Sequence, residues 1–253
     1  MKRARDLTVV SLLAVLVWIG WGLDPFSASE GALQPGEPAI PRTAHAQLAP
    51  SGGFGWRWPR IQPGDEYPLD HFERHVPTEG RLHCPDVDMV RYRGEVVRYA
   101  RPIRVAEVFV PKLRAFEEAV RDVAVRHYGR APRRIVHLGT HNCRRVRGRP
   151  YRMSEHALGN GIDVSGFSFG AASRELRRAS PDMPRHLTRP FEVTVLRHWY
   201  ADSERGELHA RFLRDLTEEL AERGVFRAMI GPRHRFHRNH FHFDYGPFRY
   251  RIL

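Results

Sequence analysis

Hydrophobic residues recur at helical spacing in two long stretches of the chain. Between residues 110 and 129, apolar side chains fall on one face of a helix, with Pro111 near its start and Gly129 where a helix would stop. Between residues 206 and 224 a leucine or phenylalanine returns every four residues, and Gly224 follows the run. We therefore expect an amphipathic helix in each stretch.

Shorter apolar or alternating runs predict β-strands. They are residues 134–139, 161–167, 191–198, 226–232 and 240–246. In the second run, Ile162 and Val164 fall on one face and Asp163 and Ser165 on the other. Helices and strands follow one another without regular alternation, which favours an α+β fold with a small antiparallel sheet flanked by helices.

The first part of the chain differs in composition from the rest. Residues 7–23 carry no charge and follow a basic start, which predicts a signal peptide or an N-terminal membrane anchor within residues 1–27. Residues 28–75 are rich in Pro and Gly and predict a linker, so we expect the folded domain over residues 76–253. Cleaved or not, this start predicts export to the periplasm or cell envelope, with anchoring in the inner membrane if residues 7–23 are retained.

The formal net charge of +12 comes almost wholly from arginine, because Lys2 and Lys112 are the only lysines. Such a charge suits a solvated surface or attraction to an anionic envelope polymer such as peptidoglycan. Predicted export and the scattered positions of the arginines argue against nucleic acid as the partner.

Two cysteines, Cys84 and Cys143, lie in the part of the chain that is expected to be exported. An oxidising compartment favours a structural disulfide between them, and two unpaired buried thiols are the alternative. Neither cysteine belongs to a Cys-x-x-Cys pair, so a role as a metal ligand is not expected.

Two distant segments hold residues that suit a metal. In the run 237–245, alternation along a strand puts His240, His242 and Asp244 on one face and the aromatic residues on the other. His156 and Asp163, with one or both of those histidines, form a nitrogen and oxygen set of the kind that zinc accepts, leaving a position open for water. A single His-x-His pair is more often structural, so the prediction rests on the combination.

Five other histidines have no comparable setting, and we interpret them as packing or surface residues. They are His127, His137, His186, His198 and His209.

The two segments resemble a known family. SEHALGNGIDVSGF (154–167) followed by HRNHFHFD (237–244) is similar to the extensin-like C-terminal domain of bacterial envelope proteins, and residues 139–156 resemble the segment leading into the first motif. The resemblance covers about residues 82–245. That family is in turn similar to the zinc peptidases that group lysostaphin, D-Ala-D-Ala carboxypeptidases and the hedgehog fold.

The resemblance implies a role for each matching residue. His156, Asp163 and His242 would be the zinc ligands, with His240 beside the metal. His237 occupies the position of a base in murein endopeptidases, and Arg144 that of an arginine facing the substrate carbonyl or carboxylate. Ser154 and Asp244 would support the ligands by hydrogen bonds.

One position departs from the pattern of the zinc carboxypeptidases. Their acidic residue three positions before the last zinc histidine is replaced here by Asn239. Proton transfer would then fall to His240 or His237. The expected function is an exported zinc-dependent amide hydrolase acting on peptidoglycan peptides or cross-links, and the alternative is a catalytically inactive, zinc-bearing domain that binds the envelope.

Overall fold

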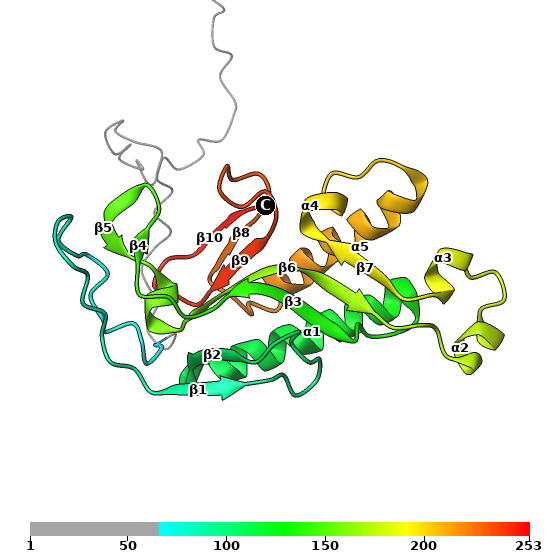
Figure 1. Ribbon diagram of the computed structural model, residues 1–253, viewed down its shortest axis with the longest axis horizontal. Coiled ribbons are helices and arrows are strands. Elements are labelled where there is room, and N and C mark those ends of the chain that lie inside the picture. Colours follow the sequence, from blue (N-terminus) through cyan, green and yellow to red (C-terminus); the bar gives the residue numbers. More distant parts are fainter. Residues whose placement is uncertain (1–65) are drawn as a thin grey trace, which may run out of the picture. The chain divides into compact units, whose positions relative to one another are not determined.

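The computed structural model describes residues 66–253 (Figure 1). The predicted signal peptide or anchor, and all of the predicted linker before residue 66, lie outside the described residues. Within them, no helix combines the length and the apolar character needed to cross a bilayer.

Ten strands and two long helices dominate the described part of the chain. The strands are β1 (Met89–Tyr92), β2 (Ile103–Ala106), β3 (Arg134–Gly139), β4 (Arg145–Val146), β5 (Arg149–Met153), β6 (Gly161–Phe169), β7 (Phe191–Thr194), β8 (Ala228–Ile230), β9 (Phe241–Asp244) and β10 (Tyr250–Ile252). The helices are α1 (Val110–Tyr128), α2 (Arg174–Ala179), α3 (Arg185–Thr188), α4 (Val195–His198) and α5 (Glu204–Glu222), with short 3-10 turns η1 (Glu107–Phe109) and η2 (Glu155–Leu158).

A six-stranded sheet lies at the centre of the fold, in the order β10-β8-β9-β6-β3, and β7 also pairs with β6. The first half of β6 pairs with β9 and its second half with β7, both antiparallel. The α+β class predicted from the sequence is confirmed. The sheet is not purely antiparallel, however, because β10 runs parallel to β8.

Helices α1 and α5 form where the apolar spacing predicts them, and they contact each other. Gly129 ends α1 in the left-handed conformation with φ of 67°, which is why glycine stands there. The helices pack against the sheet through aromatic rings: Phe116 of α1 contacts Phe243 of β9, and Phe212 of α5 contacts Phe167 of β6. Phe243 of β9 thereby faces the core.

The structure corrects two boundaries. The predicted strand 191–198 ends at Thr194, whose hydroxyl accepts a hydrogen bond from the Arg197 amide and so starts α4. The packed part of the chain also begins before residue 76, because Tyr67, Leu69 and Arg74 are buried.

Candidate metal centre

Three side chains from the two predicted segments meet on the face of the sheet away from Phe243. Asp163 of β6 lies opposite His242 of β9 in the strand register, and His156 comes from the 3-10 turn η2 just before β6. Asp163 Oδ1 is 3.2 Å from His156 Nε2 and 2.9 Å from His242 Nδ1, and the two nitrogens are 3.1 Å apart. Among residues 66–253, this is the single cluster of three His, Cys, Asp or Glu residues with metal-binding spacing.

Gly159 allows the turn that brings His156 to β6. Its φ is 62°, and a Cβ atom at this position would lie 2.7 Å from the backbone nitrogen of Ala106. A larger residue would therefore force η2 away from β2.

The outer nitrogen of each imidazole is tied to an acceptor. His156 Nδ1–H donates to the backbone carbonyl of Thr140, and His242 Nε2–H donates to Asp244 Oδ2 at 2.7 Å. The backbone amide of Gly246 donates to the other Asp244 oxygen at 2.9 Å and fixes that carboxylate. The inner nitrogens, His156 Nε2 and His242 Nδ1, both face Asp163 Oδ1, and each would offer a lone pair to a metal ion bound between them.

The spacing of these three atoms fits a tetrahedral ion. Zinc bonds of about 2.0–2.1 Å to nitrogen and oxygen place neighbouring ligand atoms about 3.3 Å apart. The three observed separations, 2.9, 3.1 and 3.2 Å, are close to that value. The three ligand atoms therefore fit zinc, whose tetrahedral geometry has one further position beyond them.

The charges of the site also suit a cation. Burial alone would lower the pKa of His242, but its hydrogen bonds to Asp163 and Asp244 outweigh burial and raise that pKa to about 10. Burial acts to raise the pKa of Asp163, yet its bonds with His156 and His242 hold it far below its ordinary value. Two carboxylates thus favour positive charge here, and a bound metal would replace a proton.

Further histidines lie in a row beside the three candidate ligands. His240 Nε2 is 3.7 Å from Asp163 Oδ1, while its Nδ1–H donates to the side-chain oxygen of Asn239 at 2.9 Å. The ring centre of His237 lies 4.8 Å from that of His240, and its Nδ1 is 2.7 Å from His234 Nδ1. Burial, with the neighbouring histidines, lowers the pKa of His237 to about 3. His240 and His237 are thus neutral rings at the edge of the site.

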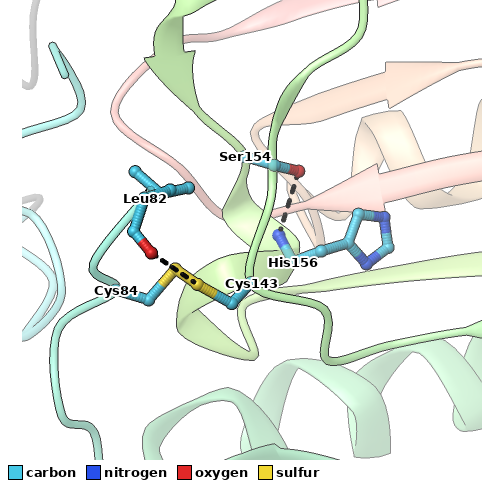
Figure 2. Close-up of a disulfide and its surroundings, with 5 residues drawn as sticks. All are labelled: Leu82, Cys84, Cys143, Ser154 and His156. Carbon is cyan, nitrogen blue, oxygen red and sulfur yellow. Dashed lines mark hydrogen bonds between the residues drawn. A yellow bond between two sulfur atoms is a disulfide. The ribbon is translucent and has the colours of Figure 1, made fainter. Parts of the chain in front are cut away.

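Arg144 and Ser154 lie at the base of the β4–β5 hairpin. The positive charge of Arg144 is close enough to act on His240 and to help lower its pKa, although burial is the larger cause. The Ser154 hydroxyl accepts a 3.4 Å hydrogen bond from the backbone amide of His156 and caps η2 (Figure 2). Ser154 therefore bonds to the backbone of His156, and the imidazole ring of His156 is oriented by the carbonyl of Thr140.

A disulfide joins Cys84 to Cys143, next to Arg144 in the chain, as predicted (Figure 2). It links the loop before β1 to the segment that leads into the hairpin. The predicted alternative of two free thiols is therefore wrong.

Within residues 66–253, the five histidines interpreted as packing or surface residues make their hydrogen bonds and ring contacts with residues other than the three candidate ligands. His209 is a buried example: its Nδ1 accepts a hydrogen bond from the Tyr128 hydroxyl at 2.9 Å. Burial, with the charges of His198 and His186, lowers the pKa of His209 to about 4.

Sequence reasoning missed two supports of the site. One is the Thr140 carbonyl, a backbone group that carries no signal in a residue pattern. The other is Arg74, whose guanidinium binds the Glu155 carboxylate with bonds of 2.9 and 3.0 Å. Glu155 also accepts from the Asn160 side chain at 2.9 Å, so this network holds both ends of η2. The sequence signal that could have pointed to this network is the acidic residue Glu155, directly before the candidate ligand His156.

Comparison with known proteins gives one match. The family described as Extensin-like protein C-terminus matches residues 67–251, which is most of the chain. No curated protein and no solved structure matches the chain.

Proposed function

The chain belongs to the extensin-like protein C-terminus family, and we propose that it is an exported zinc-dependent amide hydrolase acting on peptidoglycan peptides or cross-links. The observation that carries the proposal is the convergence of His156 Nε2, Asp163 Oδ1 and His242 Nδ1, with the outer nitrogen of each imidazole held by an acceptor. Such an arrangement is typical of a catalytic zinc site with three protein ligands.

His156, Asp163 and His242 would hold the ion, and Asp244 would fix the orientation of His242. When bound, zinc supplies Lewis acidity, which polarises an amide carbonyl and lowers the pKa of a water molecule to about 7. The hydrogen bond that His242 Nε2–H donates to Asp244 would keep the proton on Nε2, leaving Nδ1 unprotonated and correctly aimed at the ion.

His240 is the residue best placed to move the proton. Because its Nδ1–H is bound to Asn239, its Nε2 carries the lone pair, and that atom lies at the edge of the site near Asp163. It would take a proton from the attacking water and return it to the leaving amine. Asn239 would thus support catalysis without being acidic, because its side-chain oxygen keeps the proton of His240 on Nδ1. His237, behind His240, is the second candidate for this role.

Arg144 supplies positive charge on the same side as His240. It would stabilise the oxyanion that forms on the amide oxygen, or hold a carboxylate of the substrate. The net charge of +12 would attract the chain to an anionic wall polymer. The resemblance of both motifs to zinc peptidases, and the apolar start typical of exported proteins, support the same function.

The test is digestion of purified peptidoglycan by the full chain with added zinc, followed by mass analysis of released peptides. We expect products from the wild type, none from His156→Ala, and a loss of at least about 100-fold in rate for His240→Ala with zinc still bound. His127→Ala is the matched control, since this histidine contacts Asp215 away from the site. Bound zinc without any released product would overturn hydrolysis and favour the inactive envelope-binding domain.

A further inference from the structure

Arginines gather on the two segments that border the candidate metal centre. The β4–β5 hairpin and its approach, residues 144–152, contain five arginines, and the loop 233–240 contains three more (Figure 1 shows the hairpin). Neither segment contains an acidic residue. The segments meet at the hairpin turn, because a Cβ atom on Gly148 would lie 3.9 Å from side-chain atoms of both Arg235 and Phe236.

Phe236 holds one arginine from each segment. The guanidinium carbons of Arg147 and Arg235 each lie 4.4 Å from the centre of its ring. The two cations are therefore no more than twice that distance apart. Stacking uses the flat face of a guanidinium and leaves its N–H groups, which lie in the plane, available to an oxyanion.

These N–H groups have no other use in the part of the chain that the structure describes. No hydrogen bond or ion pair from the side chains of Arg147, Arg149 or Arg235 is found there, and all three residues are exposed. Arg145 differs from these three, although it lies in the same hairpin. Its guanidinium donates to the backbone carbonyls of Pro77, Glu79 and Gly80 and so stabilises the fold.

The arginines are linked to the metal centre by short steps. The charge of Arg149 acts on His234, whose ring contacts that of His237, and His237 contacts His240. At the base of the hairpin, the Arg144 carbonyl accepts from the Ser154 amide, and Ser154 caps the turn that carries His156. A ligand bound along the hairpin would thus continue into the candidate metal centre.

We infer that Arg147, Arg149 and Arg235 form a subsite for carboxylates, which selects acidic peptides carrying two or more free carboxyl groups. A fork of guanidinium N–H groups matches the two oxygens of a carboxylate, and several forks in a row match several carboxylates on one chain. As a determinant of substrate choice the subsite rests on the proposed hydrolysis; as a binding site it does not.

The test is fluorescence anisotropy of the full chain with two labelled synthetic peptides of one sequence. One peptide carries three free carboxyl groups, and in the other all three are amides. We expect the free acid to bind at least about tenfold more tightly, and Arg147→Gln/Arg235→Gln to remove about tenfold of that affinity without changing the amide peptide.

The double variant Arg177→Gln/Arg178→Gln on α2 is the matched control, because it removes the same charge from exposed residues at the far end of the domain (Figure 1). It should change the affinity less than about twofold. Equal losses in both double variants would show a general charge effect and would overturn the inference. So would equal binding of the acid and amide peptides, or displacement by inorganic phosphate at lower concentration than by acetate at matched ionic strength.

Two arms separate this inference from the proposed function. Arg149→Gln is a milder variant for use if the double variant does not fold, and it should also reduce the affinity for the acid peptide. His242→Ala should abolish hydrolysis and keep the preference for the acid peptide. Wild-type hydrolysis of both peptides at equal rates, unaffected by the arginine variants, would refute the subsite as a determinant of substrate choice and leave the hydrolase proposal standing.

Discussion

Replacing Arg74 by methionine should destabilise the domain strongly, because it leaves the Glu155 carboxylate buried without its partner. Both side chains are about 5% exposed, and the guanidinium makes two bonds to Glu155. Arg74 also donates to the carbonyls of Leu69 and Phe72 at 2.6 Å. Removing one partner of a buried pair costs about 3–5 kcal/mol, and a single amide donor from Asn160 remains to compensate.

The assay is urea denaturation of the full chain in a double-mutant cycle. Arg74→Met should lower the free energy of unfolding by about 3–5 kcal/mol. Adding Glu155→Gln should recover part of this loss, since an uncharged amide is less costly to bury than an unpaired carboxylate. Arg114→Met is the control: its exposed contact with Glu118 should be worth less than about 1 kcal/mol.

A loss below about 1 kcal/mol for Arg74→Met would refute the reasoning. It would mean that the segment around Arg74 is not needed to hold η2, although its side chains are buried.

Three further predictions concern the disulfide, the support of the metal ligand and the response to acid. Cys84→Ser/Cys143→Ser opens a loop whose ends are 59 positions apart, so urea unfolding should show a loss of about 4 kcal/mol; an unchanged midpoint would contradict the bridging role. Asp244→Asn should weaken zinc affinity by about 10–100-fold in calorimetry, because it weakens the hold on His242, and equal affinity would argue against that support. Burial of the His209 ring disfavours its protonated form in the folded protein and lowers its pKa from 6.5 to about 4. Its contribution to stability is thus complete above about pH 6.5 and is lost as the pH falls toward 4, by at most about 1.4 kcal/mol per pH unit. Urea unfolding at a series of pH values should show that the free energy of unfolding of His209→Gln depends less on pH between about 4 and 6.5 than that of the wild type. An unchanged pH dependence would contradict the role of this residue.

The long helices and the strands that form the core could be predicted because their apolar spacing matches the side chains that the fold buries. Phe116 and Phe212 repeat on helical faces, and Phe241 and Phe243 alternate with the polar residues of β9. The hairpin β4–β5 could not be found this way, because its strands are short, rich in arginine and bury only Met153. The helix α4 was missed since Val195 and Leu196 continue the apolar run of β7, and only the capping hydroxyl of Thr194 marks the change.

The residues of the candidate metal centre could be predicted for a different reason. Asp163 and His242 lie on strands whose other face is aromatic or aliphatic, so alternation alone turns them to one side. The pairing of β6 with β9 is a long-range event that no local pattern encodes, and it decides that these two residues lie opposite each other. The carbonyl of Thr140 and the amide of Asn239 act through single hydrogen bonds, whose geometry exists only in the folded chain.

Zinc titration of the full-length, metal-free protein by isothermal calorimetry is the sharpest test of the proposed metal centre. We predict one ion per chain for the wild type and for His127→Ala. His156→Ala, Asp163→Ala and His242→Ala should each lose at least about 100-fold in affinity, because each removes a ligand atom. Failure of the wild type to bind zinc, or equal affinity in the three ligand variants, would contradict the central claim.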